Sequence, residues 1–204
     1  MPVEVAAHAG FCMGVKRAVE MAEAAVGDGI PSYTLGELIH NPDVVRRLAE
    51  RGLEPITSPE EAAGRRVLIR SHGVSPEVPE QLRSAGSEVL DLTCPFVDRL
   101  HRIVEEGSRD GMLVVLVGEK DHPEVRGTAG WAHGEVRIVA EAAEAMELPE
   151  TDRAVAVCQT TFPKSRWEEI LGVLKQKDCR RWTGRQLYAR QPFRIPAGMR
   201  SSGS

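Results

Sequence analysis

The chain alternates short apolar runs with amphipathic stretches from near its start to about residue 178. The apolar runs are rich in β-branched residues, as in VEVAAH, RVLI, MLVVLV and AVAVC, which predicts buried strands. After most runs comes a polar turn and then apolar residues three and four positions apart, the spacing of a helix with one buried face. Strands that alternate with helices in this way predict an α/β fold of repeated βα units with mostly parallel sheets.

Local signals mark where some of these helices begin and end. Asn41 is a predicted N-cap, Pro42 suits a first helical position, and Gly52 is a predicted stop. Ser75 and Pro76 are expected to open the helix after the RVLI strand. We expect the buried helical faces to comprise Val15, Ala18, Val19, Ala22 and Val26 in the first helix, Val97, Leu100, Ile103 and Val104 in a central helix, and Trp167, Ile170, Leu171 and Leu174 in the last.

A boundary near residues 94–97 divides the pattern into two similar α/β units, 1–94 and 95–178. Beyond Gln176 the periodicity stops, and residues 179–204 carry six arginines and no acidic residue. We therefore expect an irregular, disordered basic tail over 179–204.

Charge and composition exclude some classes of function. Without the tail the chain has 20 basic and 30 acidic residues, a balance that argues against a nucleic-acid-binding protein. Its longest apolar run, MLVVLV, is far too short to span a bilayer, and no secretory pattern is present. We expect a cytoplasmic protein in which the four cysteines do not form disulfides and some of them serve metal or redox chemistry.

Chemically active residues follow the predicted strands. In open parallel sheets ligands bind beyond the carboxyl ends of the strands, so these positions are the first candidates for a site. Read in order along the chain, they are Cys12, His40, His72, Cys94, His122, Glu124, Cys158 and Thr160.

Cys12 and Cys94 each stand where a helix is predicted to begin. The positive end of a helix lowers the pKa of a thiol and favours the thiolate, which is a ligand for iron or zinc. Their wide separation excludes a local zinc-ribbon or ferredoxin motif, so thiolates would have to converge from different units. Alternatively, each cysteine is a small buried hydrophobic residue, and this is the preferred interpretation of Cys158 within AVAVC.

Three histidines, His40, His72 and His122, follow separate strands and could together bind an anion such as a diphosphate. The absence of a GxxxxGK loop excludes a nucleotide-triphosphatase site. For each histidine the alternative is a capping or core hydrogen bond, and His8, His101 and His133 are interpreted as structural.

Glu124 lies two residues after His122, so in an extended segment both side chains would point the same way. A carboxyl group there could carry protons, or it could be a solvated acid in a loop. Thr160 could contact a substrate or cap the following helix.

Six motifs together resemble the 4-hydroxy-3-methylbut-2-enyl diphosphate reductase family, also called the LytB family. In chain order they are GFCMGVKRA, GELIHNPDVV, RSHGVSPEV, DLTCPFV, GEKDHPEVRGT and CQTT. The resemblance covers residues 1 to about 178, and it is specific because all six motifs occur in the order of the family.

The resemblance implies an oxygen-sensitive [4Fe-4S] enzyme that removes the allylic hydroxyl of its substrate with two electrons and protons. The products would be isopentenyl and dimethylallyl diphosphates, at the last step of the non-mevalonate isoprenoid route, with ferredoxin or flavodoxin as electron donor. By position, Cys12 and Cys94 would be cluster ligands, and His40, His72 and His122 would surround the diphosphate. Glu124 would deliver protons and Thr160 would lie near the reacting end.

The chain departs from the family pattern at its carboxyl end. Members of the family continue into a third α/β unit that carries the third cysteine and a Ser-x-Asn group, and the opening strand 1–13 belongs with that unit. Here Cys179 stands about where the third ligand is expected, but the family pattern does not continue after it. Two hypotheses follow: an iron-sulfur reductase that is inactive if the last third is missing, or a non-catalytic α/β module that binds an anion or zinc through the same residues.

Overall fold

The computed structural model describes residues 10–177. Helices and strands alternate along this part of the chain, and its strands form two parallel sheets, which confirms the predicted α/β class. The predicted opening strand VEVAAH and the tail from residue 179 onward lie outside the described residues.

The first sheet has the strand order β2-β1-β3-β4, with every neighbouring pair parallel. Its strands are β1 (Ser32–Leu35), β2 (Leu53–Ile56), β3 (Arg66–Ile69) and β4 (Glu88–Asp91). Helix α1 (Met13–Val26) precedes β1, and the strands are connected by α2 (Pro42–Ala49), the 3₁₀ helix η1 (Pro59–Ala62) and α3 (Glu77–Ser84).

The second sheet has the order β6-β5-β7 and is also parallel. It consists of β5 (Leu113–Val117), β6 (Val136–Val139) and β7 (Ala154–Cys158). The central strand β5 and its neighbour β7 are buried along their whole length. Helices α4 (Pro95–Arg109), α5 (Pro123–Ala129), α6 (Ala142–Met146) and α7 (Lys164–Gln176) accompany this sheet.

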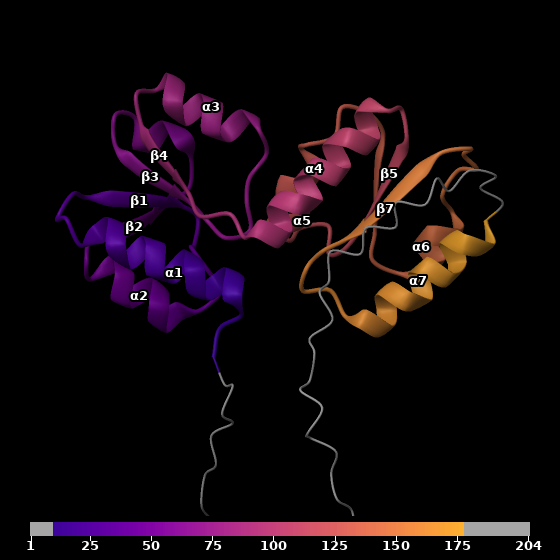
Figure 1. Cartoon of the computed structure of the whole chain (residues 1–204), viewed down its shortest axis with the longest axis horizontal. Helices are drawn as coiled ribbons and strands as arrows, with labels where there is room; N and C mark the ends of the chain where they lie inside the picture. Colours follow the sequence, from indigo (N-terminus) through magenta and orange to yellow (C-terminus); the bar gives the residue numbers. More distant parts are fainter. Residues whose placement is uncertain (1–9, 178–204) are drawn as a thin grey trace, which may run out of the picture.

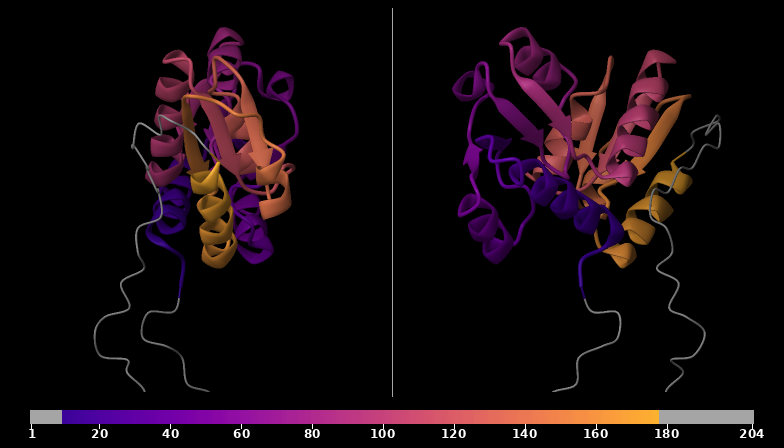
Figure 2. Two further views of the ribbon diagram at one scale, coloured as in Figure 1. Left: turned by 90° about the vertical axis from the view of Figure 1, so that its right-hand side faces the viewer. Right: turned by 60° about the vertical axis from the view of Figure 1, so that its left-hand side comes forward.

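The two sheets form two lobes that lie side by side, with α4 and α5 between them (Figure 1). The right-hand view in Figure 2 shows the same separation of the two sheets. Helix α4 packs on β5, β7 and α5, so it belongs structurally to the second sheet although it directly follows β4.

Several local predictions are confirmed at the helix ends. Asn41 caps α2 by accepting a hydrogen bond from the Val44 amide, and Pro42 is the first residue of that helix. Cys12 and Cys94 occupy the N-cap positions of α1 and α4. These residues therefore stand at helix starts, as the sequence indicated.

The predicted helical faces are mostly confirmed as buried. Val15 and Leu171 are the exceptions, because each is partly buried and packs against the edge of its core cluster. The faces of α1, α4 and α7 that are buried include Ala18, Val19, Ala22, Val26, Val97, Leu100, Ile103, Val104, Trp167, Ile170 and Leu174.

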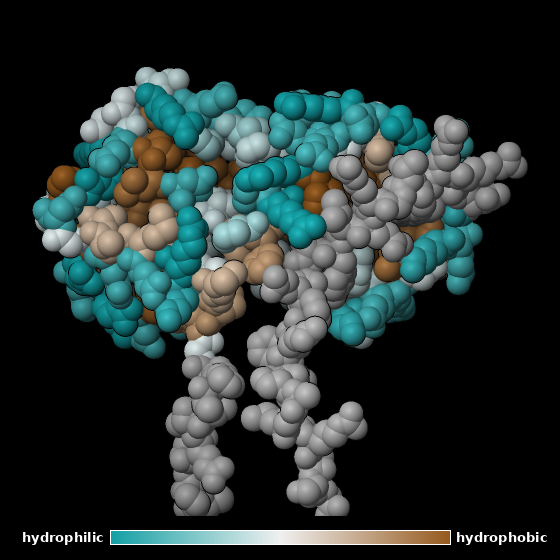
Figure 3. Space-filling view, in the orientation of Figure 1, coloured by the Kyte–Doolittle hydropathy of each residue, from teal (hydrophilic) through white to brown (hydrophobic). Residues whose placement is uncertain are grey.

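The face of the molecule drawn in Figure 3 is mainly hydrophilic, with hydrophobic residues confined to small patches. No helix between residues 10 and 177 combines the length and the apolar character that crossing a bilayer requires.

Candidate functional site

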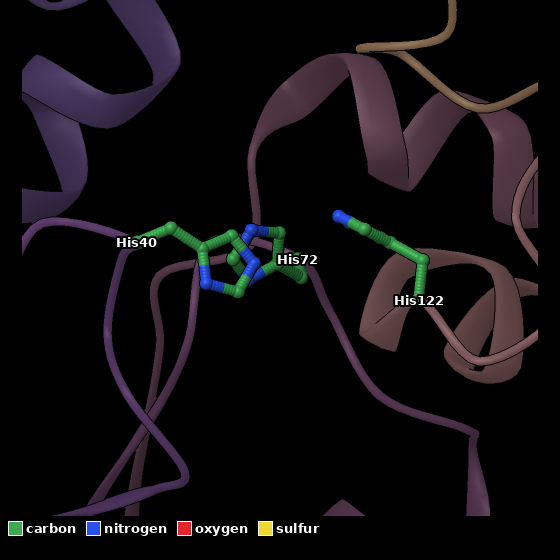
Figure 4. A group of neighbouring side chains, drawn as sticks. All are labelled: His40, His72 and His122. Carbon is green, nitrogen blue, oxygen red and sulfur yellow. The ribbon is translucent and has the colours of Figure 1, made fainter.

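Three histidine side chains from separate strand ends meet between the two lobes. His40 and His72 come from loops after β1 and β3 of the first sheet, and His122 comes from the loop after β5 of the second. The ring centroids are 4.5 Å apart for His40 and His72, 5.6 Å for His40 and His122, and 5.5 Å for His72 and His122. Figure 4 shows the three rings directed toward one another. The structure therefore brings together imidazoles that are far apart in the sequence.

Two arginines increase the positive character of this site. Burial lowers the pKa of Arg70, and the nearby charge of Arg126 lowers it further. The Nε atom of Arg70 is buried without a hydrogen-bond partner. Its guanidinium lies against Gly36, where an added Cβ would be 2.5 Å from Nη1. Within residues 10–177 neither arginine forms an ion pair, so their charge is left for something else to neutralise.

Two of these histidines, His72 and His122, have lowered pKa values. Burial is the main cause that lowers the pKa of His72 to about 3, and His40, Arg70 and His122 add electrostatic repulsion. Burial also lowers the pKa of His122, and His40 contributes in the same direction. The Nδ1 atom of His72 is buried without a hydrogen-bond partner. An anion placed here would relieve the repulsion and satisfy unpaired polar atoms.

The hydrogen bond of His122 favours an anion over a metal ion at this site. Ring nitrogens of His40, His72 and His122 lie within 4.8 Å of one another, a spacing at which a metal ion could also be held. However, His122 accepts a hydrogen bond at Nδ1 from the Glu124 amide, 3.2 Å away. A neutral imidazole that accepts at Nδ1 carries its proton on Nε2. His122 therefore offers a donor toward the centre, and the charges of Arg70 and Arg126 also disfavour a cation.

Glu124 does not lie in an extended segment, contrary to the sequence prediction. His122 is the N-cap of α5 and Glu124 belongs to its first turn, because Pro123 begins a helix there. Nor is Glu124 a solvated acid: it is 2% exposed. Its two carboxyl oxygens contact Thr160, one at 2.6 Å from the amide nitrogen and the other at 2.7 Å from Oγ1.

Burial and hydrogen bonding act on Glu124 in opposite directions. Burial raises the pKa of its carboxyl group, while the two hydrogen bonds with Thr160 lower it, and burial prevails. Thr160 does not cap α7, because Pro163 occupies that position. The loop after β7 therefore presents Thr160 to the first turn of α5, and the pair forms a buried acid and a partly buried hydroxyl close to His122.

The two described candidate cluster ligands stand at neighbouring helix starts. Cys94 is half-buried and Cys12 is exposed. A Cβ atom added to Gly14 would lie 2.3 Å from the Cys94 sulfur, so this sulfur lies against the first turn of the helix that Cys12 caps. Cys158 is buried in the core of the second sheet, as preferred from the sequence. Cys179 lies outside the described residues.

The prediction that the helix start lowers the pKa of Cys94 is wrong. Burial raises the pKa of this thiol and outweighs the amides of Phe96 and Val97, which lower it. The negative charges of Cys12 and Glu124 also raise the pKa of Cys94. Both groups are therefore within electrostatic reach of the Cys94 sulfur.

Arg70 is the main site residue that the sequence prediction missed. It directly follows β3, so the same attention to strand ends that selected His72 could have selected it. Arg126 gave no such signal, because it lies within α5 and reaches the site through the tertiary fold.

Comparison with known proteins gives consistent matches. The family model described as LytB protein matches residues 3–185. The chain is 46% identical over 182 residues to a 4-hydroxy-3-methylbut-2-enyl diphosphate reductase of Caldanaerobacter subterraneus subsp. tengcongensis, covering 87% of this chain and 63% of that protein. It is 44% identical over 172 residues to the protein of the same name from Aquifex aeolicus, covering 82% of this chain and 60% of that protein.

Solved structures agree with these sequence matches. A (E)-4-hydroxy-3-methyl-but-2-enyl diphosphate reductase, described as the terminal enzyme of the non-mevalonate pathway, matches with a TM-score of 0.77 and 41% identity. That match covers 87% of this chain and 64% of the other chain. The E-1-hydroxy-2-methyl-but-2-enyl-4-diphosphate reductase of Plasmodium falciparum matches with a TM-score of 0.79 and 28% identity, covering 84% of this chain and 55% of the other. The chain thus spans less than two thirds of the length of these relatives.

Proposed function

The chain belongs to the LytB protein family, and from that membership we propose that it acts as a reductase on 4-hydroxy-3-methylbut-2-enyl diphosphate. The products are isopentenyl diphosphate and dimethylallyl diphosphate. The observation that carries the proposal is the group of His40, His72 and His122 beside Arg70, which has excess positive charge and hydrogen-bond donors for a diphosphate. Because the reduction consumes two electrons, the proposal includes ferredoxin or flavodoxin as the electron donor. It also includes a cytoplasmic location.

In this proposal the diphosphate binds where the three imidazoles meet. The Nε2 hydrogen of His122 donates to a phosphate oxygen, and Arg70 supplies a fixed charge that charge-assisted hydrogen bonds can use. Binding of the dianion raises the pKa of His72, since it replaces repulsion by attraction. The imidazoles thereby hold the substrate with its allylic end free to extend toward Glu124 and Cys94.

Glu124 and Thr160 form the proton-delivering pair of the proposed reaction. The raised pKa of Glu124 keeps a larger fraction of this carboxyl group protonated than an exposed glutamate would have. Thr160 Oγ1 donates a hydrogen bond to Glu124 Oε2 at 2.7 Å. When Oε2 is protonated the direction reverses, and the acid can pass its proton to the hydroxyl while the hydroxyl gives its own proton to the substrate. Thr160 is less buried than Glu124, which suits it to touch the substrate.

The described cysteines suit an iron-sulfur cluster in position and chemistry. Cys12 and Cys94 occupy the N-cap positions of α1 and α4, and Gly14 leaves room for the Cys94 sulfur. Cys12 and Cys94 would hold the cluster, with Cys179 as the third ligand. When bound, a [4Fe-4S] cluster supplies electrons and a Lewis-acidic iron.

Calorimetric titration with inorganic diphosphate tests the anion site. We expect Arg70→Gln and His122→Ala each to weaken diphosphate binding roughly 10-fold or more, because each removes a hydrogen bond to a charged group. The matched control is Arg83→Gln, which removes an exposed arginine from α3. If both site variants bind diphosphate as tightly as the control does, the proposed substrate site is wrong.

Anaerobic reconstitution with iron and sulfide tests the cluster. We expect a brown protein whose electron paramagnetic resonance signal after reduction is lost in Cys12→Ser and Cys94→Ser and retained in Cys158→Ser. Cys158 is the control because it is buried in the core of the second sheet. A colourless protein that binds zinc stoichiometrically in air would instead support the non-catalytic alternative.

A further inference from the structure

Helix α5 and its C-cap residue, Gly130, pack tightly against the loop that carries His72. A Cβ atom added to Gly127 would lie 3.3 Å from the Gly73 carbonyl oxygen, and one added to Gly130 would lie 2.4 Å from the Ser75 Cβ. Glycine at these positions therefore lets the second lobe approach the backbone of residues 73–75 in the first lobe.

An aromatic pair reinforces this contact. The indole nitrogen of Trp131 donates a hydrogen bond to the Val74 carbonyl, at 2.9 Å. The ring of His101 stacks on that of Trp131, with centroids 4.9 Å apart and planes inclined by 15°. His101 is 2% exposed, and its edge lies against Gly73, where an added Cβ would be 2.5 Å from Cε1. His101 thus contacts both Trp131 and the residue next to His72.

This packing connects two residues of the candidate site. His72 directly precedes Gly73, whose amide donates to the Arg70 carbonyl, so the loop also carries Arg70. His122 caps the other end of α5. A displacement of α5 relative to residues 73–75 therefore changes the separation of His72 from His122. The glycines and the aromatic pair fix the relative position of imidazoles that come from different sheets.

We infer that Gly130, Trp131 and His101 are positioning residues that set the His72 to His122 geometry for anion binding. They touch the supporting loop and not the anion. The consequence for binding rests on the proposed function, whereas the positional effect on His72 does not. A diphosphate spans two phosphoryl groups, so its affinity depends on this separation more than that of a smaller anion would.

Two variants and a matched control test the inference in the full chain. Gly130→Ala places a methyl group against Ser75 and separates the two surfaces, and Trp131→Phe keeps a stacking ring but removes the hydrogen bond to Val74. The control is Gly134→Ala, because a Cβ there would have the Ser108 carbonyl oxygen, at 3.8 Å, as its nearest contact. Gly134 follows α5 in the same segment and has no positive φ.

Two measurements separate this inference from the proposed function. The first is the affinity for inorganic diphosphate, which we expect to fall at least about 5-fold in Gly130→Ala and Trp131→Phe and to remain unchanged in Gly134→Ala. The second is the pKa of His72 in the absence of ligand, followed by nuclear magnetic resonance. We expect this pKa to rise from its low value toward 6.5 in both variants, because the loosened loop admits water between His72 and its neighbours His40, Arg70 and His122.

The outcomes are distinguishable. If wild-type protein does not bind diphosphate but the pKa of His72 still rises in both variants, the proposed function fails and the positioning role stands. If Trp131→Phe and Gly130→Ala match Gly134→Ala in both measurements, the positioning role is wrong. A fall in thermal stability without a change in either measurement counts as the same contradiction, since it indicates a purely structural contact.

Discussion

At the scale of single residues, Glu124 is a carboxyl group whose burial disfavours its charged form. Its pKa is raised from 4.5, so the folded protein retains a proton that the unfolded chain releases. The contribution of Glu124 to the unfolding free energy therefore decreases as the pH rises above about 4.5. Glu124→Gln keeps an acceptor for the Thr160 amide but carries no charge. We expect this variant to gain stability relative to wild type as the pH rises, which thermal unfolding at a series of pH values measures.

The control for this residue is Glu169→Gln, which changes an exposed glutamate in α7. Its difference from wild type should not vary with pH in the same way. A constant difference between wild type and Glu124→Gln from acid to neutral pH would show that burial does not govern this carboxyl group.

The sequence identified the residues of the candidate site better than it predicted their burial and their pKa values. The positions of His40, His72 and His122 after strands were readable from the apolar pattern, and Arg70 could have been found in the same way. The burial of Glu124 and the raised pKa of Cys94 were not readable, because both depend on elements distant in the sequence. Local rules assigned Cys94 a lowered pKa, and tertiary burial reversed the sign.

At the scale of helices and strands, we expect alanine substitutions at two glycines in different helices to change the stability of the protein in opposite directions. A Cβ on Gly107 in α4 would lie 2.6 Å from Val155 Cγ1 in the buried strand β7, whereas one on Gly172 in α7 would meet nothing within 4 Å. Gly107→Ala should destabilise the protein by about 1 to 3 kcal/mol through overpacking. Gly172→Ala should stabilise it by roughly 0.5 to 1 kcal/mol, because alanine favours the helix more than glycine does. Urea unfolding of both variants measures these changes.

If both alanine variants change stability in the same direction, the close packing of α4 on β7 is not as described.

Helix ends such as Asn41 and Pro42 were predictable because capping is local. The strand orders β2-β1-β3-β4 and β6-β5-β7 were not, since they depend on which crossover packs best among distant segments.

At the scale of the whole molecule, neutral buried imidazoles make folding sensitive to acid. Burial is the main cause that holds the pKa of His72 at about 3 and that of His101 at about 4, both below the ordinary value of 6.5. As the pH falls below 6.5, these two histidines bind protons in the unfolded chain but stay neutral in the folded protein. Their contribution to the unfolding free energy therefore decreases. Glu124 acts in the opposite direction over part of this range, so the pH dependence caused by the histidines is measured in the Glu124→Gln variant.

In Glu124→Gln protein we expect the two buried histidines to cost about 1 to 2 kcal/mol each between neutral pH and about pH 5. Inorganic diphosphate should reduce this loss, because the anion favours protonated His72 and so brings its folded pKa closer to the unfolded value. Urea unfolding at the two pH values, with and without diphosphate, measures both effects. Equal unfolding free energies at the two pH values without ligand would contradict the neutral burial of His72 and His101. An acid loss that diphosphate does not reduce would instead indicate that the anion binds away from His72, so that the histidine group between the two lobes is not the proposed substrate site.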